Sequence, residues 1–266
     1  MRKGSSILHN YTEEIKNLYL NSMMPLQKIA DRYNVSRESI TNFAKRNGWY
    51  GLRKDSPKAI YSVDAGYFDD IDSNKKAYWL GFIAADGNIR QDYLCLSIEL
   101  AISDREHLVK FQQDINTNAP IKDSFRKYSS SYIRINNKQI CLALSKYGII
   151  PNKSLSFVIH KELLPSCFIR DFIRGYFDGD GSIYQDARGQ WGINFTGSHS
   201  FMLQLQEMLP IHMGLYNKGN YSSLETQNKE KIEEFIKYIY TDATVYLERK
   251  YQKACQFYKP STTTKG

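Results

Sequence analysis

Apolar residues between Tyr11 and Trp49 recur three and four positions apart, a spacing that predicts three short helices. Thr12 would cap the first helix, and Pro25 suits the first turn of the second. The third helix is expected from position 36 to about position 46. These helices would form a small module ahead of a longer region in which helices and strands alternate.

The joint between the second and third predicted helices resembles a helix-turn-helix motif. Asn34 is expected in the left-handed conformation that ends a helix, Ser36 would cap the next one, and the small Ala30 lies where the two helices would approach. Outward positions of the third helix carry hydrogen-bonding side chains suited to base edges and phosphates. The DNA contacts expected from this helix are Arg37, Ser39, Thr41, Asn42, Lys45 and Arg46. A three-helix bundle that binds protein is the alternative.

The remaining pattern predicts the same order of elements twice, with strands marked by alternating apolar residues and helices by apolar residues on one face. In the first half we expect a strand through 94–100, a helix over 104–115, a hairpin of 120–128 and 131–137, and a helix through 142–147. In the second half we expect a strand through 191–195, a helix over 199–209, a hairpin over 215–225 and further helices.

An internal repeat supports this duplication. Residues 77–87 read AYWLGFIAADG and residues 171–181 read DFIRGYFDGDG, so each is an apolar segment that ends in Asp-Gly. At an offset of 94 the identical pairs are Gly81/Gly175, Asp86/Asp180, Gly87/Gly181, Ile89/Ile183, Gln91/Gln185 and Asp92/Asp186.

Small residues four positions apart give each repeat helix a face on which two backbones can approach closely. The pairs are Gly81 with Ala85 and Gly175 with Gly179. Packed on these faces, the two helices would bring the carboxylates that end them to one place. We expect the glycine that follows each carboxylate to close its helix in the left-handed conformation.

Two carboxylates, Asp86 and Asp180, at neighbouring helix C-termini repel each other and face partially negative carbonyl groups, so the arrangement requires a cation. Carboxylate and carbonyl oxygens are the ligands that hard divalent cations prefer. The repeat therefore predicts a magnesium site. The alternative is a pair of helix ends whose acids are merely solvated or neutralised.

These segments resemble the paired signature helices of the LAGLIDADG homing endonucleases, and the resemblance covers roughly residues 67–259. It implies an α+β fold, a pseudo-twofold pair of αββαββα halves whose sheets form a β-saddle over DNA, here preceded by a small all-α helix-turn-helix domain. It also implies that only the last Asp of each motif binds Mg²⁺, so Ala84, opposite Asp178, weakens the case little. The carbonyls of Ala85 and Gly179 would assist Asp86 and Asp180.

The expected domains are a helix-turn-helix domain over 1–52, a linker over 53–74 that packs partly through Tyr61 and Phe68, a first LAGLIDADG half over 75–165 and a second over 166–266.

Two lysines complete the implied catalytic set. Residues 148–154 read GIIPNKS and resemble the Gly-Ile-x-x-Asn-Lys-Ser element of the family, and residues 246–250 read YLERK and resemble its counterpart. Lys153 and Lys250, with Asp86 and Asp180, are therefore the expected catalytic residues, the lysines stabilising charge on the scissile phosphates. Arg249 competes with Lys250 for this assignment, and two ordinary surface lysines are the alternative.

The resemblance further implies that polar strand faces read the DNA sequence, because amide and guanidinium groups match base edges in the major groove. The expected contacts are Asn88, Arg90, Gln91, Lys122, Arg126, Arg134, Asn136, Tyr184, Gln185, Arg188, Gln190 and Asn194.

Charge and composition agree with a nucleic-acid partner. The formal net charge is +8, and residues 1–58 hold eleven Lys and Arg against five Asp and Glu. No apolar run approaches the ~20 residues of a membrane span, and the four dispersed cysteines suggest neither a zinc site nor a disulfide framework. No secretory signal is visible, which favours the cytoplasm of a bacterium or phage host.

The sequence therefore predicts a monomeric, site-specific endonuclease of a phage or mobile element that makes a magnesium-dependent break in double-stranded DNA, without a small-molecule cofactor. By the family pattern the break would leave 3′ extensions. The chain ends without the His-Asn pair of intein splicing, so an intein is not expected. A DNA-binding regulator that lost cleavage, or an RNA-binding maturase that assists intron splicing, would share the same fold.

Overall fold

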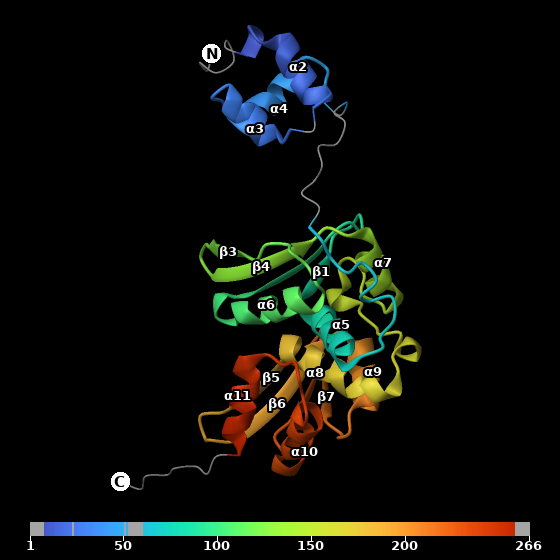
Figure 1. The fold of residues 1–266 in the computed structure, drawn as a ribbon. Coiled ribbons are helices and arrows are strands. Elements are labelled where there is room, and N and C mark those ends of the chain that lie inside the picture. Colours follow the sequence, from blue (N-terminus) through green and yellow to red (C-terminus); the bar gives the residue numbers. More distant parts are fainter. Residues whose placement is uncertain (1–7, 23, 51, 53–60, 259–266) are drawn as a thin grey trace, which may run out of the picture. The chain divides into compact units, whose positions relative to one another are not determined.

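The computed structural model describes residues 8–22, 24–50, 52 and 61–258 (Figure 1). The chain divides into two compact units at the boundary between residues 60 and 61. Each unit has its own hydrophobic core. No helix in the described ranges is long and apolar enough to cross a membrane.

The first unit contains the three expected helices, α2 (Thr12–Leu20), α3 (Leu26–Arg32) and α4 (Arg37–Arg46). Ile29, Ile40 and Phe43 are fully buried between them. The turn before α4 confirms two predictions, since Asn34 has a φ of 50° and the Ser36 hydroxyl accepts a hydrogen bond from the Ser39 N–H.

The predicted cap of the first helix is wrong. Thr12 is the first residue of α2, and its hydroxyl donates to the carbonyl of His9 instead of accepting from the helix. The chain upstream is already turned at this point, so the hydroxyl binds a preceding carbonyl before the helix begins.

The second unit consists of two αββαββα halves and one added helix. The first half contains α5 (Asn74–Asp86), β1 (Gly87–Ile89), β2 (Leu96–Ala101), α6 (Arg105–Asp114), β3 (Lys122–Phe125), β4 (Ser129–Ile135) and α7 (Lys138–Lys146). The second contains α8 (Ile169–Asp180), β5 (Gly181–Gln185), β6 (Trp191–Gly197), α9 (His199–Met208), β7 (Gly214–Asn217), β8 (Ser222–Thr226) and α10 (Lys229–Tyr240), and is followed by α11 (Glu248–Phe257). Short 3₁₀ turns lie at Ile102–Asp104, Lys153–Leu155, Lys161–Leu163 and Ser166–Phe168.

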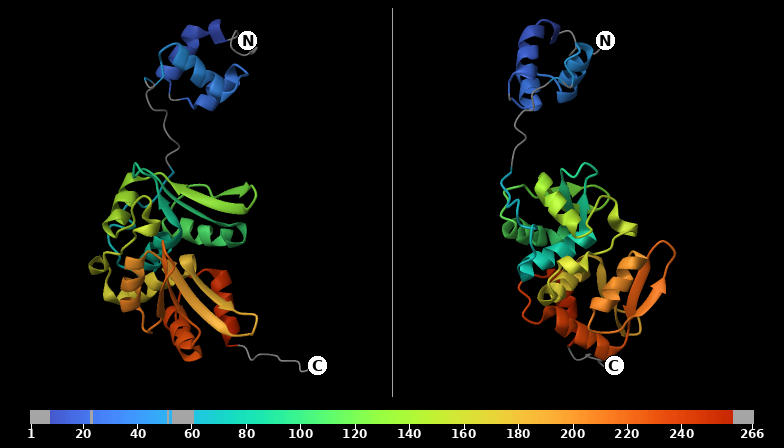
Figure 2. Two further views of the ribbon diagram at one scale, coloured as in Figure 1. Left: turned by 180° about the vertical axis from the view of Figure 1, so that it is seen from behind. Right: turned by 90° about the vertical axis from the view of Figure 1, so that its right-hand side faces the viewer.

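The two sheets have equivalent topologies, β1-β2-β4-β3 and β5-β6-β8-β7, and all their neighbouring strands are antiparallel. Their strands alternate as predicted: Ile98 pairs with Ile133 on the buried face, while Ser97 pairs with Arg134 on the other. Helices cover one face of each sheet, as the views in Figure 2 show. The predicted α+β fold with paired halves is therefore confirmed.

Helices α5 and α8 pack directly on each other at the centre of the second unit (Figure 1). A Cβ atom on Gly81 would lie 2.0 Å from the Phe172 carbonyl oxygen, and one on Gly175 would lie 1.9 Å from that of Tyr78. Real Cβ atoms do not approach oxygen so closely, so only glycine permits this contact. The predicted small-residue faces thus form the interface between the halves.

The predicted left-handed closure of these helices is wrong. Gly87 (φ −77°, ψ 144°) and Gly181 (φ −82°, ψ 165°) are extended, because each begins a strand directly at the helix end. Glycine is needed there for another reason. A Cβ on Gly87 would lie 2.5 Å from the Ile83 side chain, and one on Gly181 would lie 2.2 Å from the Phe177 ring.

The segment before α5 joins this core. Tyr67, Phe68 and Ile71 are buried, so the expected packing of Phe68 is confirmed, whereas Tyr61 is 36% exposed and contributes little. Residues 53–60 lie outside the described part of the chain.

Candidate functional site

Two carboxylates meet where α5 and α8 end. A Cβ on Gly179 would lie 2.3 Å from the Cβ of Ala85 and 3.4 Å from Oδ2 of Asp86, so the helix ends touch beside this carboxylate. Burial, and then the nearby charge of Asp180, raise the pKa of Asp86 to about 6. Loss of hydration also raises the pKa of Asp180, although its side chain is partly open to solvent. The structure therefore brings the two motif acids together.

Two buried lysines bind the carbonyls at the ends of the same helices. The Lys153 ammonium donates to the carbonyls of Gly87 (2.7 Å) and Ala85 (3.4 Å), at the end of α5. The Lys250 ammonium donates to those of Phe177 (2.6 Å), Gly179 (3.0 Å) and Gly181 (2.5 Å), at the end of α8. Each cation thus binds carbonyls gathered where a helix ends, where the helix dipole favours positive charge.

The ammonium and carboxylate groups influence one another. Burial lowers the pKa of Lys250 to about 8, while the negative charges of Asp178, Asp86 and Asp180 raise it in part. Burial also lowers the pKa of Lys153. Both lysines are only 5–6% exposed, so the interpretation as ordinary surface lysines does not fit this structure.

The oxygens here are those that a hard divalent cation prefers. Within the described ranges no group of three or more His, Cys, Asp or Glu side chains could hold a metal ion. A cation between the helix ends would therefore rely on Asp86 and Asp180 together with carbonyls, water and substrate oxygens. The carbonyls of Ala85 and Gly179 already accept from lysines, but a carbonyl oxygen has a second lone pair. The donor set fits Mg²⁺ on this chemistry.

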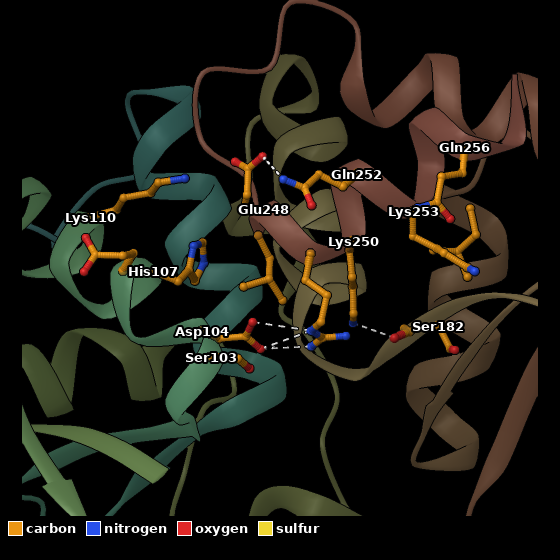
Figure 3. Close-up of a pocket in the computed structure, with 15 residues that line it drawn as sticks. Ser103, Asp104, His107, Lys110, Ser182, Glu248, Lys250, Gln252, Lys253 and Gln256 are labelled. Atoms are coloured by element: carbon orange, nitrogen blue, oxygen red, sulfur yellow. Dashed lines mark hydrogen bonds and ion pairs between the residues drawn. The ribbon is translucent and has the colours of Figure 1, made fainter. Parts of the chain in front are cut away.

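Two hollows adjoin the ends of the helix pair. One, of about 450 Å³, is lined by Lys153, Tyr176, Asp180 and Thr196 among others. The other, of about 630 Å³, lies between α6 of the first half and α11 of the second and is lined by Lys250 (Figure 3). Both open beside the lysine-bound helix ends, which leaves space for a ligand near each ammonium group.

Arg249 was the alternative to Lys250 as the positive group of the second half, but it has a different partner. Its guanidinium reaches across to Asp104 of the first half, at 3.0 Å from Nη2 and 3.2 Å from Nε to the same carboxylate oxygen (Figure 3). Lys250, rather than Arg249, therefore lies at the helix end. Arg249 and Asp104 are 145 positions apart, so the sequence carried no local signal of this ion pair.

A buried network below the carboxylates was also missed. Asp178 is 1% exposed and accepts from the hydroxyls of Tyr78 (2.7 Å) and Tyr240 (2.9 Å) and from the Leu247 N–H (2.7 Å). His107 Nε2 lies 2.9 Å from the Tyr78 oxygen. Because Tyr78 donates to Asp178, Nε2 donates to the Tyr78 oxygen. Burial lowers the pKa of this imidazole to about 3, so its neutral form carries the proton on Nε2.

The predicted strand contacts lie on the open sheet faces and their hairpins. Exposed are Asn88, Arg90, Gln91, Lys122, Arg126, Arg134, Asn136, Gln185, Arg188 and Gln190, whereas Tyr184 and Asn194 are partly buried. Three of them have intramolecular side-chain contacts: Arg90 pairs with Asp92 (2.8 Å), Gln185 donates to the Gly189 carbonyl (2.8 Å), and the Arg134 guanidinium lies over the Tyr132 ring (4.8 Å to its centroid).

In the first unit, the predicted DNA contacts of α4 are also partly exposed and partly buried. Arg37, Asn42, Lys45 and Arg46 are exposed. Ser39 and Thr41 are partly buried and bind neighbouring groups, the Ser36 hydroxyl and the Arg37 carbonyl.

Comparison with known proteins agrees with this geometry. Residues 168–240, which include α8, match the family model of a LAGLIDADG-like domain. A stretch of 118 residues is 28% identical to the replication factor C small subunit of Methanocaldococcus jannaschii, covering 44% of this chain but only 6% of that relative's length.

Among solved structures, I-SmaMI bound to an uncleaved DNA target in the presence of calcium ions is similar at a TM-score of 0.50 and 15% identity, over 68% of this chain and 89% of that one. The LAGLIDADG meganuclease I-AabMI bound to uncleaved DNA gives 0.46 and 14%, over 67% and 88%. At 15% identity, the likeness to I-SmaMI shows a shared fold, that of the LAGLIDADG meganucleases.

Proposed function

We propose that this protein is a site-specific endonuclease that hydrolyses one phosphodiester in each strand of double-stranded DNA. One observation carries the proposal. Asp86 and Asp180 end two packed helices whose other terminal carbonyls are bound by Lys153 and Lys250. Such a site combines a place for a cation with two positive groups for phosphate, which is the requirement of phosphoryl transfer.

Asp86 and Asp180 would hold Mg²⁺, with the carbonyls of Ala85 and Gly179 as additional ligands. When bound, the ion supplies an activated water and stabilises the leaving oxygen. Lys153 and Lys250 would place positive charge beside the phosphate as its negative charge increases. Because their carbonyl partners fix both ammonium groups beforehand, little reorganisation is needed at the moment of reaction.

The open faces of the two sheets would bind the duplex. Exposed Asn88, Arg134 and Lys122 on the first sheet and Gln185 and Arg188 in the second half supply amide and guanidinium groups for base edges and cations for phosphates. The first unit would bind a flanking sequence through α4. Since both motif helices belong to one chain, we expect a monomer, acting in the cytoplasm of a bacterium or phage host.

Cleavage of a randomised plasmid library, with and without Mg²⁺, tests the proposal. We expect magnesium-dependent linearisation of a subset of sequences, and loss of it in Asp86→Asn and in Asp180→Asn. Asp72→Asn is the matched control, because its exposed carboxylate pairs with Lys76 near the start of α5, at the opposite end of that helix from Asp86. Sequence-specific binding without cutting under any divalent ion would instead support a regulator, and preference for a structured intron transcript would support a maturase.

A further inference from the structure

The two lysines are held in place by different structures. Lys250 lies in the first turn of α11, whereas Lys153 begins a 3₁₀ turn that follows Asn152, a residue with a φ of 58°. The lysines are 97 residues apart in sequence, close to the repeat offset of 94. The supports of the two ammonium groups are nevertheless unequal.

One connection between α8 and the first turn of α11 passes through Leu247, three residues before Lys250. The Leu247 N–H donates to Oδ2 of Asp178 at 2.7 Å, and the Leu247 carbonyl accepts from the Lys250 N–H at 3.0 Å. Leu247 is also the N-cap of α11, and its own side chain gives the helix no capping hydrogen bond. Asp178 therefore fixes the peptide on which α11 begins.

The Asp178 carboxylate is buried, and both of its oxygens accept hydrogen bonds. It lies two residues before Asp180 on α8 and is 1% exposed, and the hydroxyls of Tyr78 and Tyr240 occupy its other acceptor positions. The equivalent residue of the first half is Ala84, which has no side-chain acceptor. No corresponding bond can therefore support the turn that carries Lys153.

We propose that Asp178 is a positioning residue for Lys250, and that it controls cleavage of the one DNA strand that Lys250 serves. The predicted effect on cleavage rests on the proposed function, whereas the predicted effect on the position of Lys250 does not. Without the carboxylate, the start of α11 loses the hydrogen bond from the Leu247 N–H to α8, while the bond from Arg174 to the Val245 carbonyl remains. The ammonium then no longer stays fixed beside the carbonyls of Phe177, Gly179 and Gly181, while Lys153 is unaffected.

The choice of variants follows from the hydrogen bonds. Asp178→Ala removes every acceptor. Asp178→Asn can keep its oxygen toward Tyr78 and Leu247 while its amide donates to the Tyr240 oxygen, so it should restore function. Tyr240→Phe deletes one donor to the same carboxylate but leaves the Leu247 bond, and is the matched control for lost stability. If Asp178→Ala does not fold, Leu247→Pro is the second variant. It removes the Leu247 N–H that donates to Asp178, and the φ of −78° at this position is one that proline adopts.

The experiment measures the single-turnover rate of each strand on a target labelled separately on its two strands, below the unfolding transition of every variant. Asp178→Ala should slow one strand by about tenfold or more, a barrier change of about 1.4 kcal/mol, and leave the other within about twofold, so that nicked DNA accumulates. Asp178→Asn and Tyr240→Phe should cut both strands normally. Lys250→Met should slow the same strand, and adding Asp178→Ala to it should have little further effect.

Hydrogen exchange of the Leu247 amide and the NMR signal of the Lys250 ammonium group give a second readout that needs no catalysis. Both should change in Asp178→Ala and be restored in Asp178→Asn. Equal slowing of both strands, or an unchanged Lys250 signal, would overturn the inference. If the wild-type protein cuts neither strand while these signals behave as expected, the proposed function fails and the positioning role stands.

Discussion

Gly81 and Gly175 each lie against the backbone of the other's helix, so that neither position has room for even one methyl group. The contact joins the two halves of the second unit directly below the carboxylates of Asp86 and Asp180. Stability and site geometry therefore depend on the same pair of glycines.

Replacing either glycine by alanine should strongly destabilise the second unit. The added Cβ would meet backbone atoms at 2.0 Å or less, and backbone within two packed helices cannot move aside as a flexible side chain can. We expect a loss of at least about 3 kcal/mol in the free energy of unfolding, at the upper end of overpacking effects. Denaturant unfolding of Gly81→Ala and Gly175→Ala measures it.

Gly66→Ala is the matched control. A Cβ there would first meet a carboxylate oxygen of Asp69 at 3.4 Å, an ordinary contact. Its unfolding midpoint should stay close to that of the wild-type protein. Equal stability of all three variants would show that the helices do not approach as described.

The buried His107 should make the protein less stable in mild acid. Burial lowers the pKa of this imidazole to about 3, whereas an unfolded histidine titrates near 6.5. Below pH 6.5 the unfolded chain therefore binds a proton that the folded chain refuses, and stability falls as the pH falls. At pH 5.5 this group alone should cost about 1.4 kcal/mol relative to pH 8.

Unfolding of the wild-type protein and of His107→Gln, measured at both pH values, isolates this contribution. The variant should be less stable at pH 8, because the contacts of the ring are lost, but it should lose less stability between pH 8 and 5.5. Parallel losses in the two proteins would mean that His107 is accessible to protons in the folded state.

Much of the fold and the position of the acids could be predicted because their signals are local or periodic. The alternation of Leu96 and Ile98 marks a strand, and the offset of 94 between Asp86 and Asp180 marks two equivalent helix ends. The bonds of Asp178 and Arg249 could not be predicted in this way, since their partners lie 62–145 residues away and no spacing rule connects them.

The conformation after the helices shows a second kind of limit. Glycine after the last residue of a helix commonly takes the left-handed conformation, yet Gly87 and Gly181 are both extended. The direction in which a strand leaves a helix depends on the sheet that it joins, which is a tertiary property. Glycine is needed at both positions because a side chain would collide with Ile83 or Phe177, and not because the backbone has a positive φ.

The charge of Lys250 should depend on Asp86. With a pKa of about 8, the ammonium group loses its proton near that pH, and the Asp86 carboxylate favours the protonated form. Asp86→Asn should therefore shift the titration of Lys250 to lower pH. Nuclear magnetic resonance of labelled lysine in metal-free protein follows this directly, and Lys250→Met identifies the signal.

Asp92→Asn, which alters an exposed carboxylate of an ion pair, should leave the midpoint of that lysine unchanged. A Lys250 midpoint that remained the same in Asp86→Asn would contradict the electrostatic coupling between the two helix ends.

If α4 contacts DNA as proposed, Arg37 and Lys45 should contribute to affinity mainly through phosphates. Each alanine variant should weaken binding at low salt and reduce the slope of log affinity against log salt by about one. Titration of a fluorescent duplex at several salt concentrations measures both quantities.

Lys16→Ala is the matched control, because it removes the same charge from α2, where the ammonium lies 3.9 Å from Glu13. An equal change in slope for Lys16→Ala would indicate general attraction to a basic unit. No change for Arg37→Ala and Lys45→Ala would remove α4 from the DNA interface.

The difference between Ala84 and Asp178 is possible only because both helices belong to one polypeptide. In a homodimer each position occurs twice with the same side chain, and a buried acid on one helix would require a second one across the axis, with its own set of donors. Gene duplication removes that constraint. After duplication each lobe can gain or lose a buried group while its neighbour stays unchanged.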